Sequence, residues 1–147
     1  MKAFSSLTRS EEDRRVLIVW AAACAERVLD LFEAVRSGDD RPRKAVEGAR
    51  AWARGKIRVG DARRLAFASH AAAREAAQPE AVAAARACGQ AVAVAHMAGH
   101  ARGAADYAAK AVSFANSTGS ESAQSEVAWQ RANVPEQFLS FVYPEDA

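Results

Sequence analysis

The sequence predicts an all-α protein, a single compact bundle of about five to six helices. Alanine supplies 38 of the 147 residues, and no other residue has a higher helix propensity. Apolar residues recur at helical spacing, and no stretch alternates bulky β-formers with polar residues. Because alanine buries little area, we expect close helix packing throughout the bundle.

The first helix, expected over residues 14–36, is the one around which the others should pack. It holds the only long run of large apolar side chains, and we predict that Trp20 is buried. Thr8 and Ser10 are both candidates for its N-cap, and a serine-glycine pair at 37–38 ends it.

Residues 39–42, Asp-Asp-Arg-Pro, predict the start of a second helix that runs to about residue 54. An aspartate cap with proline in the first turn is a strong start signal. A cap needs one carboxylate, so we expect the second aspartate to pair with Arg43 or with an arginine of another helix. Arg41 and Glu47 would then face a groove or a partner.

Four further helices follow from caps and breakers in the sequence. Asp61 should cap the third, Pro79 should open the fourth, and glycines near residue 100 should precede the fifth. The expected ranges are 62–77, 79–98, 99–116 and 121–132. We expect one domain over 1–147, with a flexible N-terminus at 1–9 and a C-terminal extension, 117–147, that packs on the bundle.

The net charge of +2 hides a strong segregation of charge along the chain. Residues 10–40 hold eight acids and four bases, residues 41–64 hold nine bases and two acids, and residues 117–147 hold five acids and one base. We expect the acidic ends to fold back on the basic middle. The alternative is a nucleic-acid-binding protein that uses 41–64, which the modest net charge and the lack of interleaved aromatic residues disfavour.

The expected location of the protein and the state of its cysteines are inferred from the lack of targeting and membrane-spanning patterns in the sequence. The first 13 residues have no apolar core of a signal peptide. The most apolar stretch, 81–98, is interrupted by an arginine, a glutamine and a histidine, so no membrane span is expected. We therefore expect a cytoplasmic protein in which Cys24 and Cys88 are buried, reduced thiols.

The histidines are the side chains that could carry metal chemistry. His96 and His100 are four residues apart, and His70 could supply a third ligand. This leaves a small metal-dependent enzyme as an alternative. The glutamate of the helical zinc-protease motif is missing between the two histidines, so structural or hydrogen-bonded histidines are favoured. We expect no metal, no cofactor and no catalytic residues.

Several segments resemble a family of small helical bacterial proteins, the putative immunity proteins of polymorphic toxin systems. The resemblance covers about residues 14–115 and leaves the tail after residue 116 outside. Its most specific part is 39–52, and Arg27 departs from it, since many relatives have histidine there. The segments that carry it are 20–29 (WAAACAERVL), 39–45 (DDRPRKA) with Glu47, 49–55 (ARAWARG), 68–74 (ASHAAAR), 95–101 (AHMAGHA) and 105–108 (ADYA).

The resemblance implies a non-enzymatic protein that binds and neutralises a cognate toxin made by the same or a neighbouring cell. Charge complementarity often governs such binding, because it speeds association and sets specificity. We expect a monomer or a homodimer. The partner-binding candidates are Asp39, Asp40, Arg41, Arg43, Glu47, His70 and His100.

Overall fold

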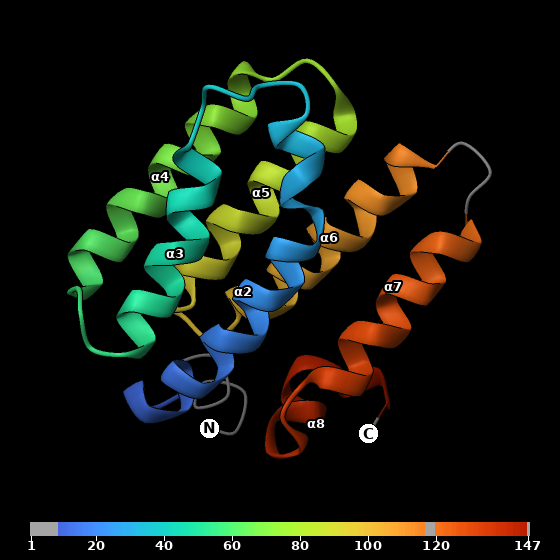
Figure 1. Cartoon of the computed structure of the whole chain (residues 1–147). Coiled ribbons are helices and arrows are strands. Elements are labelled where there is room, and N and C mark those ends of the chain that lie inside the picture. The colour runs from blue at the N-terminus through green and yellow to red at the C-terminus, as the bar shows by residue number, and fades with distance from the viewer. Residues whose placement is uncertain (1–8, 117–119, 147) are drawn as a thin grey trace.

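The computed structural model describes residues 9–116 and 120–146. This part of the chain contains seven α-helices, two short 3-10 helices and no strand (Figure 1). In order they are α2 (Glu11–Glu33), α3 (Arg41–Ala53), α4 (Val59–Glu75), α5 (Pro79–Ala93), α6 (His100–Ala115), α7 (Ser120–Asn133), η1 (Glu136–Phe138), α8 (Leu139–Val142) and η2 (Pro144–Asp146). None of these helices is both long and apolar enough to span a lipid bilayer.

The all-α class is confirmed, but the predicted number of five to six helices is too small for the described residues. Six long helices match the six expected ones, and α8 is the addition. It lies in the apolar tail and is four residues long, which is too short to show a helical period. The predicted flexible N-terminus lies outside the described residues except for Arg9.

The helix α2 spans Glu11–Glu33 rather than residues 14–36, and two further helix boundaries, the start of α4 and the end of α5, also lie away from the predicted positions. The helix α4 begins at Val59, and Asp61 is its third residue rather than its cap. From there the Asp61 carboxylate accepts the backbone N–H of Arg58 at 3.1 Å, as the third residue of a capping box does. At the other boundary α5 ends at Ala93, not at residue 98. The next residues form i→i−3 backbone bonds, the tightening that often ends a helix.

The helix α5 lies in the middle of the bundle and contacts α2, α3, α4 and α6 (Figure 1). Most of its buried residues are alanine, which lets these neighbours approach closely. Gly48 of α3 shows how closely, since a Cβ there would clash with a methyl group of Leu65 on α4. The close, alanine-rich packing expected from the composition is therefore present in this structure.

The C-terminal segment is joined to the first helix through Trp20. Its side chain is 4% exposed, which confirms the predicted burial, and its indole N–H donates to the carbonyl of Gln130 on α7 at 3.0 Å. The ring of Tyr143 meets Trp20 edge-on, with the ring centroids 6.3 Å apart. The two cysteines, Cys24 and Cys88, are buried as predicted, and burial raises the pKa of both thiols.

Candidate functional site

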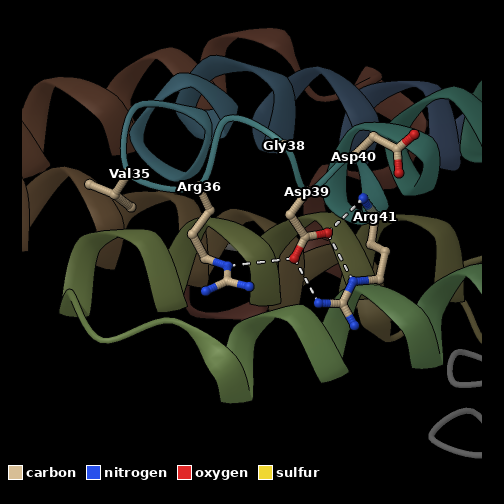
Figure 2. Close-up of a pocket in the computed structure, with 6 residues that line it drawn as sticks. All are labelled: Val35, Arg36, Gly38, Asp39, Asp40 and Arg41. Carbon is tan, nitrogen blue, oxygen red and sulfur yellow. Dashed lines mark hydrogen bonds and ion pairs between the residues drawn. The ribbon is translucent and has the colours of Figure 1, made fainter.

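The connection between α2 and α3 places Asp39 against the first residue of α3. The Asp39 carboxylate accepts the backbone N–H of Arg41 at 3.2 Å and the Arg41 guanidinium at 2.9 and 2.6 Å. Arg36 approaches the same carboxylate at 3.5 Å, as Figure 2 shows. The Asp39 side chain is 11% exposed. These hydrogen bonds from Arg41 lower the pKa of Asp39 to about 2.

Arg41 also reaches the end of α4. Its guanidinium donates to the two carboxylate oxygens of Glu75 at 2.8 and 3.3 Å, and Arg36 lies 3.5 Å from Glu75. Both carboxylates raise the pKa of Arg41, and Arg41 in turn lowers the pKa of Glu75. These four residues, which we call the Asp39 network, tie the end of α2 and the start of α3 to the end of α4.

The other sequence candidates of this block have different surroundings. Asp40 occupies the N-cap position of α3, but its side chain makes no capping bond and lies 3.5 Å from Lys44. The expected partnership of an aspartate with Arg43 is wrong, because Arg43 binds Glu33 of α2 with two hydrogen bonds of 2.6 and 2.7 Å. Glu47 is exposed and makes no ion pair with any described residue.

A pocket of about 570 Å³ opens at this connection. Arg36, Asp39 and Arg41 line it together with an exposed valine, a glycine and Asp40. Figure 2 shows the side chains of Arg36 and Arg41 directed toward the Asp39 carboxylate, while the Asp40 carboxylate points away from them. The pocket thus contains charges that are largely satisfied within the chain, and Asp40 is the lining acid outside that network.

The three histidines lie at the interface of α4, α5 and α6. The rings of His96 and His100 are 5.1 Å apart, centre to centre, and His100 Nδ1 lies 2.8 Å from the side-chain oxygen of Gln90 on α5. The ring of His70 packs on Gly89 of α5, where a Cβ would lie 2.7 Å from it. His70 of α4 and His100 of α6, both proposed from the sequence, are therefore brought to one interface, with α5 between their helices.

Burial lowers the pKa of all three histidines. Arg74 and Arg86 lower the pKa of His70 further, and Arg63 does the same for His96. No carboxylate is among the groups that act on them. The histidines are thus held neutral at pH 7 in a positively charged environment.

A comparison with protein-family models gives the decisive observation. Residues 7–137 match the model described as Imm-5 like putative immunity protein. The chain belongs to this family. No curated protein and no solved structure matches it significantly.

Membership in the Imm-5 like family confirms the resemblance and extends it. The predicted resemblance ended near residue 115, whereas the family match continues through α7 and into η1. The structure shows why α7 belongs with the rest, since Gln130 joins it to α2 and, through an amide N–H, to the Ala105 carbonyl of α6 at 2.8 Å.

The geometry also bears on the two alternatives. Among the described residues, no three His, Cys, Asp or Glu side chains are placed to hold a metal ion. The basic segment 41–64 is partly neutralised by α2: Arg43 binds Glu33, and Arg50 binds Glu26 at 2.8 and 3.0 Å. We call these cross-helix pairs the α2–α3 seam.

The C-terminal acids do not fold back on the basic middle as expected. Glu126 pairs with Arg27 of α2 at 2.7 Å, and Glu145 pairs with Arg102 of α6 at 2.8 Å. Several cations of the middle therefore keep no acidic partner in the described part of the chain. They are Arg54, Lys56 and Arg63.

Sequence reasoning missed the acidic partners Glu26, Glu33 and Glu75. The pairs involving Glu26 and Glu33 join neighbouring helices, and Glu75 meets Arg41 across 34 positions of sequence. A glutamate on an exposed helix face gives no sequence signal for its partner. The structure thus identifies Glu26, Glu33 and Glu75 as the partners of the α3 arginines.

Proposed function

We propose that this protein binds a cognate protein toxin and neutralises it without catalysing a reaction. The observation that carries the proposal is the family match over 7–137, which spans nearly all of the described helices. The name of that family indicates immunity, and immunity against a toxin can be provided by a stoichiometric binding protein. The rigid, closely packed bundle supports this mode of action, because a preorganised surface limits the entropy lost on binding.

The contact residues proposed from the sequence differ in what they could offer a toxin. Asp40 and Glu47 are exposed and lie outside the Asp39 network, so they are the acids of this block best placed for contact. Asp39, Arg41 and Arg43 already hold partners within the chain. For them we propose an indirect contribution, in which they fix the backbone that presents the exposed acids.

Co-expression tests the proposal. Each open reading frame next to the gene is expressed in a bacterial host with and without this protein. We expect one product to arrest growth and this protein to restore it, with the two proteins co-purifying in a fixed ratio. Growth arrest that this protein fails to relieve for every toxic neighbour, or relief without a complex, would contradict neutralisation by binding.

A further inference from the structure

Four cations on α4, α5 and α6 stand out because they lack acidic partners. Arg63 and Arg74 lie on α4, Arg86 on α5 and Lys110 on α6, and none makes an ion pair with a described residue. By contrast, Arg41, Arg43 and Arg50, the arginines of α3, all hold carboxylates. We call these four residues, with the three histidines between them, the basic face.

The histidines show that the basic face is continuous. Arg74, Arg86 and His100 all act on His70 and lower its pKa. His100 is in ring contact with His96, on which Arg63 acts. The unpaired arginines of α4 and α5, two neighbouring helices in Figure 1, are therefore grouped around the histidines.

A groove of about 370 Å³ between α5 and α6 lies within this face. Arg86 and Lys110 are the charged residues among those that line it, and Tyr107 lies beneath the Lys110 ammonium at 5.4 Å from the ring centre. The rest of the lining is apolar and includes Phe114, whose side chain is 51% exposed. An apolar groove flanked by unpaired cations has the features of a surface for a protein segment with apolar and acidic side chains.

We propose that the basic face is the toxin-binding surface and that its occupant is an acidic segment of the toxin, with an apolar side chain seated in the α5–α6 groove. This rests on the proposed function. Unpaired cations would attract such a segment from a distance, speed its association and lose no internal ion pair on binding.

A nucleic acid fits the same surface less well. The groove is lined mainly by apolar side chains, and the whole chain has a net charge of only +2. Tight binding to a phosphate backbone requires several cations that follow it, and its strength comes mainly from the counterions they release. An acidic protein segment uses both the apolar groove and the flanking cations, so it is the occupant that the structure favours.

The experiment compares two double charge reversals with equal change in net charge. Arg86→Glu with Lys110→Glu alters the basic face, and Arg54→Glu with Lys56→Glu alters the exposed end of α3, outside both the basic face and the Asp39 network. Affinity for the neutralised toxin is measured by calorimetry at low and high salt. We expect the first variant to lose at least about tenfold in affinity at low salt, and the second to stay within about threefold. Thermal melts verify that both variants fold.

The possible outcomes distinguish a failure of the basic face as the binding surface from a failure of the proposed function. If the toxin binds the face variant as tightly as wild type, or loses affinity only for the α3 variant, the basic face is not the binding surface. Neutralisation by binding would remain supported in either case. Loss through Val19→Glu instead would locate binding in the apolar groove of about 530 Å³ between α2 and α7. Absence of any neutralised toxin overturns the proposed function by itself.

A synthetic peptide of alternating glutamate and leucine tests the surface without the toxin. Titrated into the isotope-labelled protein, it should shift the amide signals around Arg86, Gln90 and Lys110. Shifts confined to other helices would overturn the basic face. A short DNA duplex that binds more tightly than the peptide, and loses binding through Arg86→Glu with Lys110→Glu, would replace the acidic protein segment with a nucleic acid.

Discussion

Arginines on two sides of this bundle have opposite surroundings. Along the α2–α3 seam and the Asp39 network, the arginines of α3 hold carboxylates of α2, of the preceding connection and of α4. Across the basic face, Arg63, Arg74 and Arg86 hold none among the described residues. Arginine side chains therefore join helices through ion pairs on one side of the bundle and remain available for binding on the other.

The composition of the neighbouring helix explains the difference. The helix α2 presents Glu26 and Glu33 to α3, whereas the buried faces of α5 are mostly alanine. Glu80 is the one acid of α5, and it makes no ion pair with a described residue. The arginines beside α5 thus meet a helix whose single acid pairs with none of them, so alanine-rich packing leaves their charges unpaired among the described residues.

The largest expected difference between the two sides concerns their aromatic residues. Trp52 of α3 is 2% exposed and lies under the Arg15 guanidinium, 4.5 Å from the ring centre, whereas Phe67 of α4 is 65% exposed. Trp52→Ala should lower the free energy of unfolding by about 3–5 kcal/mol, and Phe67→Ala should change it by less than about 0.5 kcal/mol. Urea unfolding measures both, and a loss above about 2 kcal/mol for Phe67→Ala would show that the α4 side is also part of the core.

A smaller effect is expected at the neighbouring aspartates. Asp39→Ala removes three hydrogen bonds from Arg41 and should cost about 1–3 kcal/mol of unfolding free energy. Asp40→Ala removes one exposed contact with Lys44 and should cost less than about 1 kcal/mol. Thermal melts of the two variants compare the stability lost with a hydrogen-bonded network to the stability lost with an isolated surface ion pair. Equal losses would mean that Asp40 is the true cap of α3.

Much of the bundle could be predicted because its signals are local. The aspartates before α3 and the proline in its first turn mark its start, and the helical spacing of large apolar residues in α2 predicts the burial of Trp20. The helix α8 could not be predicted, because four residues carry no period. Which helix faces which could not be predicted either, since alanine stripes look alike on every helix.

Several residues of the candidate site could be predicted from the sequence, but most of their contacts could not. His70 and His100 do share one interface, and the sequence already showed an arginine interrupting the apolar stretch 81–98. That arginine is Arg86, which belongs to the basic face. The partners of Arg41 and Arg43 required the tertiary structure, because a charge pair between helices depends on their rotation and not on sequence spacing.

The smallest expected effect is a pH dependence that separates the two sides. Burial lowers the pKa of His70, His96 and His100, which are all the histidines of the chain, and nearby arginines lower those of His70 and His96 further. The unfolded chain therefore binds protons more readily than the folded one as the pH falls through about 6.5. This histidine contribution to stability is complete above that pH and is lost below it, down to the lowered pKa values.

The Asp39 network titrates in a separate range. The pKa of Asp39 is lowered to about 2, so its contribution to stability is complete above its ordinary value near 3.8 and is lost as the pH falls from there toward 2. Between pH 7.5 and 5.5 the melting temperature should fall slightly, and His70→Gln should reduce the slope while Asp39→Asn leaves it unchanged. A melting temperature that rises on acidification would mean that the histidines gain acidic partners, and that the basic face is neutralised within the chain. A slope that persists in His70→Gln but disappears in His96→Gln would assign the effect to the Arg63 end of that face.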